Sequence, residues 1–133
     1  MEEVPQGLIL LDASLGEGDF DRGILEKLGH PVVVCHGPRE GERCPILGGK
    51  RCRLFEAAHG IVFALDLENE QHREILEQYR RKAGPEMPIR VVLRDDQVER
   101  FAPLLREVEF WQHEPSVADL DGFAAEVEAV DRV

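Results

Sequence analysis

The sequence predicts an α/β fold in which a doubly wound, five-stranded parallel sheet lies between two layers of helices. Strand-like and helix-like segments alternate along all 133 residues. The strand-like runs are mostly apolar throughout, which is typical of parallel strands covered on both faces. Such an alternation requires right-handed crossovers, and five units of this kind commonly take the strand order 2-1-3-4-5. We therefore expect one domain, residues 1–133, with the second and fifth strands at the edges.

The expected strands are short runs bounded by Gly, Pro or acidic residues, at positions 8–12, 31–35, 61–65, 89–93 and 108–111. The last run, Val108-Glu-Phe-Trp111, is the most polar, which suits an edge strand. Phe110 and Trp111 are adjacent in it, so their side chains should lie on opposite faces of the sheet. Because aromatic residues are enriched at interfaces, we expect a protein partner, with a homodimer through this fifth-strand edge as the preferred form. A basic heterologous partner is the alternative, because the acidic residues at 107–131 would repel each other across a two-fold axis.

The segments between the strands have apolar residues at helical spacing. Longer helices are expected at 19–28, 69–83 and 116–130, and shorter ones near 53–58 and 98–105. Asp19 is the expected N-cap of the first helix, and Gly29 should end it. Pro103 should interrupt the fourth helix. Ser116 and Asp119 have the spacing of a capping box at the start of the last helix.

Composition limits the classes of function. Hydrophobic residues make up 43% of the chain and charged residues 32%, a balance typical of soluble globular domains. The net charge of −11 repels phosphate backbones and anionic lipids, so we expect no nucleic-acid or membrane partner. The acidic N-terminus lacks the pattern of a secretory signal. An odd number of cysteines, three, favours reduced thiols in the cytoplasm, with one disulfide and a free cysteine as the alternative.

Two acidic residues mark a candidate ligand site. Asp12 follows the first apolar run, and Asp66 follows the third. In open parallel sheets, ligands bind beyond the carboxyl ends of the strands where the strand order reverses, which here lies between the first and third strands. We therefore expect Asp12 and Asp66 to converge, where they could hold a divalent cation or bind a hydroxyl-bearing ligand. The alternative is that both acids only cap the turns that follow the strands.

This layout resembles that of a response-regulator receiver domain, which has a flavodoxin-like fold. The resemblance spans the whole chain as a pattern of five βα units. It also rests on Leu-Leu-Asp12 at the end of the first strand and Ile-Val-Phe-Ala-Leu-Asp66 at the end of the third. It implies that Asp66 stands in the place of the phosphoacceptor, and Asp12 in the place of one of two adjacent acids that bind magnesium.

Three departures from the receiver pattern weigh against phosphorylation. Ala13 stands where the second acid is expected, Arg94 where receivers have Thr or Ser, and Glu114 where they have Lys before a proline. Phosphoryl transfer depends on electrostatic stabilisation, which a lost magnesium ligand and a lost cation both weaken. We therefore interpret the chain as a non-catalytic, receiver-like regulatory or protein-interaction module without a cofactor. In this interpretation the two aspartates and Arg94 form a ligand-binding or vestigial phosphoacceptor edge.

A loop rich in cysteine is the competing candidate site. Residues 36–52 form a longer connection than is usual, and Cys35, His36, Cys44 and Cys52 lie in or beside it. Four such groups could hold zinc, and nearby basic residues could activate a thiol for redox chemistry. The spacing lacks the close cysteine pairs of zinc knuckles, so structural thiols are the simpler interpretation. The alternative function is a small cysteine-dependent redox or metal-binding protein that uses this loop over the Asp12/Asp66 edge.

More specific catalytic signatures fail on inspection. The sequence contains no Walker loop, no Cys-x-x-Cys and no G-x-S-x-G, and Gly16 and Gly18 make only a fragment of a nucleotide-binding fingerprint. We therefore do not expect an enzyme.

Overall fold

The structure, a computed structural model, describes residues 7–14, 16–38, 44–84, 86–94 and 96–131. Five strands alternate with helices along the described chain. The strands are β1 Ile9–Ala13, β2 Val32–Cys35, β3 Gly60–Ala64, β4 Ile89–Val92 and β5 Glu109–Trp111. The helices are α1 Asp19–Lys27, α2 Arg53–Ala57, α3 Glu70–Lys82, α4 Gln97–Arg100 and α5 Val117–Asp131.

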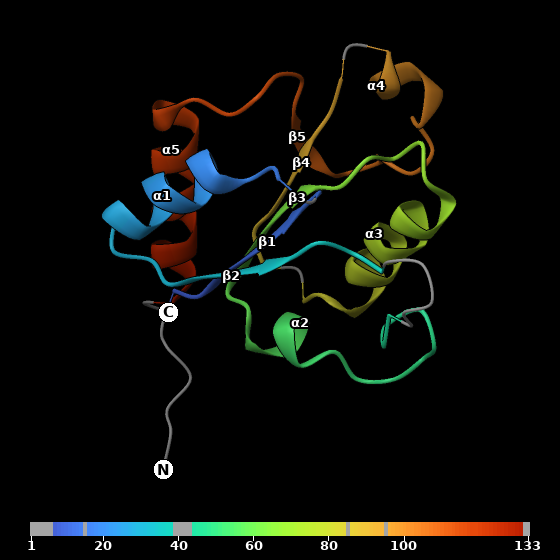
Figure 1. Cartoon of the computed structure of the whole chain (residues 1–133), viewed down its shortest axis with the longest axis horizontal. Helices are drawn as coiled ribbons and strands as arrows, with labels where there is room; N and C mark the ends of the chain where they lie inside the picture. Colours follow the sequence, from blue (N-terminus) through green and yellow to red (C-terminus); the bar gives the residue numbers. More distant parts are fainter. Residues whose placement is uncertain (1–6, 15, 39–43, 85, 95, 132–133) are drawn as a thin grey trace.

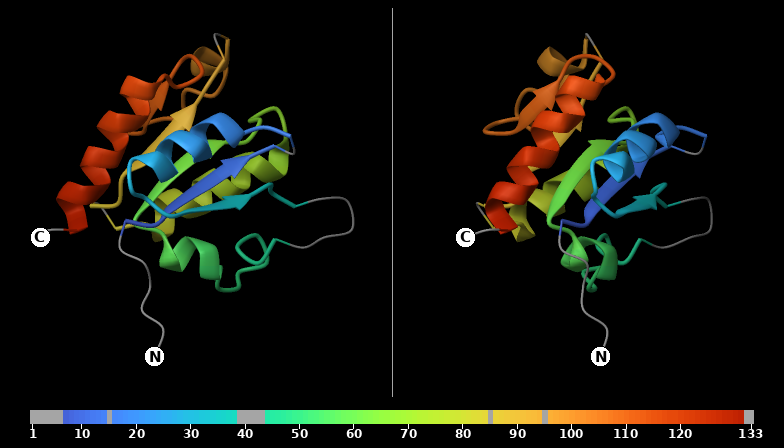
Figure 2. Two further views of the ribbon diagram at one scale, coloured as in Figure 1. Left: turned by 60° about the vertical axis from the view of Figure 1, so that its left-hand side comes forward. Right: turned by 90° about the vertical axis from the view of Figure 1, so that its left-hand side faces the viewer.

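All strand pairings are parallel, and the order in the sheet is β2-β1-β3-β4-β5. This confirms the predicted fold class and strand order, with β2 and β5 at the edges. Helices α1 and α5 cover one face of the sheet, and α2, α3 and α4 lie on the other, which gives three layers (Figures 1 and 2). None of the helices in the described ranges is long and apolar enough to cross a membrane.

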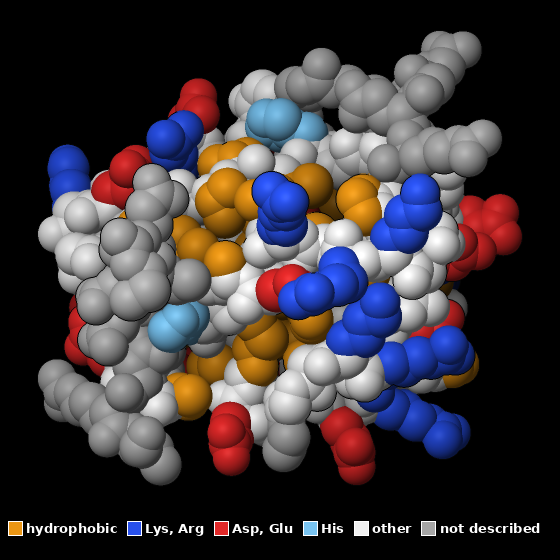
Figure 3. All heavy atoms as spheres, turned by 90° about the horizontal axis from the view of Figure 1, so that it is seen from below, with side chains coloured by type: hydrophobic (Ala, Val, Ile, Leu, Met, Phe, Trp, Pro, Cys, Tyr) orange, Lys and Arg blue, Asp and Glu red, His pale blue; other side chains and the backbone are white. Residues whose placement is uncertain are grey.

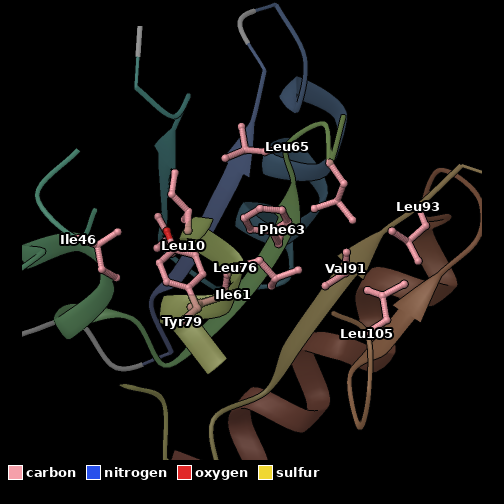
Figure 4. Packing of buried hydrophobic residues seen from close by; sticks show 12 residues of the cluster. Leu10, Ile46, Ile61, Phe63, Leu65, Leu76, Tyr79, Val91, Leu93 and Leu105 are labelled. Atoms are coloured by element: carbon pink, nitrogen blue, oxygen red, sulfur yellow. The ribbon is translucent and has the colours of Figure 1, made fainter. Parts of the chain in front are cut away.

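Each face of the sheet has its own hydrophobic core, because successive side chains of a strand point to opposite faces. We call them the α3-side core and the α5-side core. In β1, Ile9 and Leu11 belong to the α5-side core, whereas Leu10 belongs to the α3-side core. Figure 4 shows the α3-side core, in which Leu10 and Phe63 of the sheet lie close to Leu76 and Tyr79 of α3. Both faces of the central strands are buried, as the apolar runs predicted.

Helix ends follow local capping chemistry. Ser116 N–H donates to Asp119 Oδ2 (2.9 Å) and Asp119 N–H donates to Ser116 Oγ (3.2 Å), which confirms the predicted capping box. The prediction of Asp19 as N-cap is wrong by one residue, because Gly18 is the N-cap with φ of 92°. A Cβ at Gly18 would lie 2.9 Å from the Cβ of Ala13, so glycine is needed there for space as well as for conformation. The fourth helix, α4, ends at Arg100, before Pro103 is reached, and turns follow up to residue 107.

The two aromatic residues of β5 point to opposite faces, as their adjacency predicted. Phe110 packs against the α3-side core and Trp111 against the α5-side core. The rings of Trp111 and Phe123 of α5 meet edge to face, with centroids 6.2 Å apart. Both β5 side chains are therefore partly buried within the chain itself.

Arg90 of β4 stabilises this edge of the sheet. Its guanidinium pairs with Glu109 of β5 and Glu126 of α5. It also lies over the rings of Trp111 and Phe123, 5.8 Å from each centroid. The side chain of Arg90 is only 15% exposed, whereas those of Glu109 and Glu126 are 69% and 43% exposed. The two ion pairs therefore lie at the surface, and the contacts of Arg90 with the rings are the more shielded part. Two of the acidic residues near the C-terminus, Glu109 and Glu126, thus have a cationic partner within the chain. The sequence pattern did not predict this pairing.

Candidate functional site

Two cavities lie near the carboxyl ends of the strands, and Asp12 and Asp66 line different ones. The carboxyl-edge cavity, about 680 Å³, is lined by the segments that follow β1, β3, β4 and β5 and includes Asp66 and Arg94. The thiol cavity, about 430 Å³, includes Asp12, Cys35, Cys44 and Cys52. The structure therefore does not bring Asp12 and Asp66 together at a single site.

In the carboxyl-edge cavity, Asp66 belongs to the turn that leads into α3. It lies two residues beyond the end of β3. Its Oδ1 accepts hydrogen bonds from the backbone N–H of Glu68 (3.0 Å) and from Nε2 of Gln97 (3.4 Å). Its backbone carbonyl accepts a hydrogen bond from the backbone N–H of Asn69 (3.1 Å). The side chain of Asn69 caps α3. One carboxyl oxygen of Asp66 is thus engaged in holding the local turn.

Gln97 joins this turn to the start of α4. Its side chain is buried, and its Nε2 also donates to Glu68 Oε2 (3.2 Å), while its Oε1 accepts from the backbone N–H of Arg94 (3.0 Å). Glu68 further accepts two hydrogen bonds from Arg100 of α4 (2.6 and 2.9 Å). These contacts fix the β3–α3 and β4–α4 connections relative to each other. No motif in the sequence marked Gln97 for this position.

The carboxyl-edge cavity is dominated by acidic groups. Asp21 and Glu114 line it together with Asp66, whereas Arg94 is the one Lys or Arg among its described lining residues. Burial raises the pKa of Asp21 to about 6, and the nearby charge of Glu114 adds to the shift. Glu114 therefore acts as a negative charge near the place where the receiver pattern has Lys.

Asp12 faces the α3-side core and lines the thiol cavity. It lies within β1, paired with Cys35 of β2 and Phe63 of β3, and its side chain follows Leu10 onto the same face. The residue is 1% exposed, and neither carboxyl oxygen has a hydrogen-bond partner among the residues that the structure describes. Burial raises its pKa to about 7, although Tyr79 and Cys35 lie close enough to lower it in part.

The three thiols gather around the same cavity. Cys35, Cys44 and Cys52 are all free and half-buried. His36 lies elsewhere, because its Nδ1 is hydrogen-bonded to the carbonyl of Ala13 (2.8 Å). Within the described ranges, no three acidic, histidine or cysteine side chains are grouped to hold a metal ion. Residues 39–43 of the predicted loop lie outside the described residues.

The environment of Cys35 disfavours its thiolate. Burial is the main cause that raises its pKa to about 11, and the nearby Asp12 carboxyl also raises it. A reactive cysteine needs a lowered pKa, as produced by cationic neighbours. The geometry of the cavity therefore suits a half-buried, neutral thiol at this position.

Comparisons with known proteins support the fold alone. No protein-family model and no curated protein matches the sequence. NtrX from Brucella abortus, solved in complex with ATP, superposes with a TM-score of 0.62 at 14% identity, over 94% of this chain and 27% of the NtrX chain. This chain thus spans about a quarter of NtrX.

Two smaller structures align over nearly their whole length. The inactive form of the regulatory domain from the repressor of iron transport regulator (RitR) gives a TM-score of 0.56 at 13% identity, over 94% of both chains. The receiver domain of the Francisella response regulator 1452 gives 0.55 at 13% identity, over 94% of this chain and 95% of that one. The predicted resemblance is thereby confirmed at the level of architecture: this chain has the flavodoxin-like α/β fold of response-regulator receiver domains.

Proposed function

We propose that the chain is a non-catalytic, receiver-like regulatory or protein-interaction module that is not phosphorylated at Asp66. The observation that carries this proposal is the arrangement around Asp66. The carboxyl group is held by Glu68 and Gln97 in a cavity that also contains Glu114. Asp12, which the receiver pattern would place with the magnesium ligands, lines another cavity.

The electrostatics of this cavity oppose phosphoryl transfer. Transfer to a carboxylate brings together two anionic groups, and catalysis depends on cations that neutralise them. Arg94 is the available cation, but Asp21, Asp66 and Glu114 surround the same space. A module of this kind would act through the surfaces that it presents to a protein partner, and the β5 edge with Phe110 and Trp111 is our candidate surface.

Phosphodonor chemistry tests the proposal directly. We expect incubation with acetyl phosphate and magnesium to leave the intact mass unchanged, and beryllofluoride to give no bound ¹⁹F resonance. A phosphorylation-competent receiver treated in parallel verifies the reagents, and Asp66→Asn is the matched variant. Stoichiometric phosphate that is present in the wild type and lost in Asp66→Asn would contradict the proposal.

A cysteine-dependent function is the second candidate, because three thiols share one cavity. The raised pKa of Cys35 favours neutral, structural thiols instead. We therefore expect protein purified in reductant to carry no stoichiometric zinc or iron by elemental analysis. One metal ion per chain, lost in Cys44→Ser, would support the metal-binding alternative.

A further inference from the structure

We propose that the thiol cavity binds a small carboxylic acid with an apolar chain, such as a medium-chain fatty acid. The chain would lie among the thiols and the apolar side chains of the cavity, and the carboxylate would lie at the rim beside Arg51 and Arg53. This inference concerns a different cavity from the one that contains Asp66, and it goes beyond the proposed regulatory function.

The cavity has the size and the chemistry of a site for an apolar chain. Its volume of about 430 Å³ lies within the roughly 300–1,000 Å³ that is typical of small-molecule sites. Most of its described lining consists of thiols and apolar side chains, among them Ile46, Leu54, Ile75 and Tyr79. In Figure 4, Tyr79 lies between Ile46 and the central strands. Its ring stacks on Phe55 with centroids 5.1 Å apart, which makes this wall well defined. An apolar chain would therefore leave water on entering the cavity, which favours binding.

Cations gather at the rim of this cavity. Arg51 and Arg53 line the cavity itself. A smaller hollow of about 290 Å³ shares Arg51 with it and adds Lys50 and Lys82. We call these four exposed side chains the basic rim. Figure 3 shows the surface that carries α2, where Lys and Arg side chains lie beside exposed hydrophobic atoms. In a chain with a net charge of −11, such a local group of cations beside an apolar cavity favours a ligand with an anionic head group.

Glu56 does not cancel the charge of the basic rim. Nε and Nη2 of Arg51 donate to its two carboxylate oxygens (2.7 and 3.0 Å). A guanidinium has five N–H donors, so most of those of Arg51 stay available to a ligand. Glu56 lines the smaller hollow but does not belong to the described lining of the thiol cavity. The rim therefore keeps a surplus of positive charge on the side that faces the thiol cavity.

Asp12 also lines the thiol cavity, but a bound carboxylate does not meet its charge directly. Both carboxyl oxygens of Asp12 are buried, with Tyr79 and Cys35 beside them, so a molecule in the cavity contacts no polar surface of this residue. Burial raises the pKa of Asp12 to about 7. A substantial fraction of this carboxyl is therefore uncharged at neutral pH, which weakens its repulsion of an anion. Arg51 and Arg53 are thus the charged side chains of the described lining that a ligand can contact.

Three probes with the same alkyl chain and different head groups test this inference. We would measure binding of octanoate, octanol and octylamine by calorimetry and by amide NMR shifts, with reductant present. We expect octanoate to bind roughly tenfold more tightly than octanol, with octylamine the weakest. The NMR shifts should concentrate on residues 44–54 and on Tyr79. Added salt should weaken the binding of octanoate but not that of octanol, because the basic rim is exposed to solvent.

Substitutions at the rim separate the role of charge from that of the apolar lining. Arg53→Gln should weaken the binding of octanoate about fivefold and leave that of octanol unchanged. Arg51→Gln should act in the same direction, although it also leaves Glu56 without its partner. Both arginines are exposed, so the fold should tolerate either change. Arg22→Gln is the matched control: Arg22 is an exposed arginine of α1, on the other face of the sheet, and its loss should not change the affinity for octanoate.

Several outcomes would overturn the proposal. Absence of octanoate binding would do so, as would octanol or octylamine binding as tightly as octanoate. An equal loss of affinity in Arg22→Gln and Arg53→Gln would show that the overall charge governs binding, and not the basic rim. Phosphatidylglycerol vesicles test a membrane as the other source of anionic, apolar molecules. Sedimentation of the protein with these vesicles, without competition by octanoate, would assign the rim to a membrane surface and also overturn the proposal. All of these measurements are independent of the phosphorylation of Asp66.

Discussion

The buried carboxyl of Asp12 should make the protein less stable as the pH rises towards neutrality, and Asp12→Asn should remove this effect. The pKa of Asp12 is raised from 3.8 to about 7, mainly by burial. Between these two values the folded state binds the proton and the unfolded state does not. The free energy of unfolding therefore falls as the pH rises through this window. Below pH 3.8, both the folded and the unfolded state bind the proton, so the titration of Asp12 no longer changes the free energy of unfolding.

The size of the effect follows from the pKa shift. A shift of about three units at ~1.4 kcal/mol per unit gives an upper value of about 4 kcal/mol above neutral pH. The neutral carboxyl of the wild type is buried at the same place, so only the additional N–H donors of the Asn amide count against the variant, at a cost of about 1–3 kcal/mol. We therefore expect Asp12→Asn to stabilise the protein by about 1–3 kcal/mol near pH 8 and to give no gain near pH 4.

Urea unfolding, followed by the fluorescence of the single tryptophan, Trp111, measures this difference between about pH 4 and pH 8. Subtracting the wild-type curve from that of Asp12→Asn cancels the other titrating groups. Asp21→Asn is the matched control, because the pKa of Asp21 is about 6 and its difference curve should level off about one pH unit lower. A difference for Asp12→Asn that does not change with pH would refute the reasoning.

Three further predictions concern packing and assembly. Arg90→Ala should lower the free energy of unfolding by about 1–3 kcal/mol in the same urea titration, because it removes two ion pairs and the contacts with two aromatic rings. Arg90→Lys should lower it less, because Lys keeps the charge but lacks the planar guanidinium. Gly60→Ala should lower the free energy of unfolding by about 1–3 kcal/mol, because the new Cβ would lie 2.6 Å from Cγ2 of Val127. Gly23→Ala in α1 should raise the free energy of unfolding by about 0.5–1 kcal/mol, because the new Cβ meets no atom within 4 Å. The β5 edge should form a homodimer that Trp111→Ala weakens in sedimentation experiments at moderate salt; a monomer at tens of micromolar that is unchanged by the substitution would contradict this.

The fold was predictable because the signals that specify it are local and redundant. Runs such as residues 61–64 are apolar throughout, and this pattern is typical of a strand covered on both faces. The capping box of Ser116 and Asp119 was predictable for the same reason, since both partners lie within one helical turn. Helix ends that depend on packing, such as the N-cap at Gly18 beside Ala13, were harder to predict from the sequence.

The candidate sites were harder to predict, because they depend on the face to which each side chain points. Asp12 and Asp66 both follow apolar runs, but Asp12 is still in a strand, whereas Asp66 lies two residues beyond one. The period of two in β1 places Asp12 on the face of Leu10, and this parity could have separated it from Asp66. The partners of Gln97 and Arg90 are distant in sequence, so no spacing rule points to them.

The cover of the α5-side core has a consequence for the order in which the chain acquires structure during synthesis. Leu25 of α1 comes from near the beginning of the chain, whereas Leu120 and Phe123 of α5 come from near its end. Until α5 has left the ribosome, Ile9 and Leu11 in the centre of the sheet lack the cover that Leu120 and Phe123 provide. The nascent chain must therefore keep this apolar surface open until α5 has been made, and chaperones that recognise such surfaces have time to act.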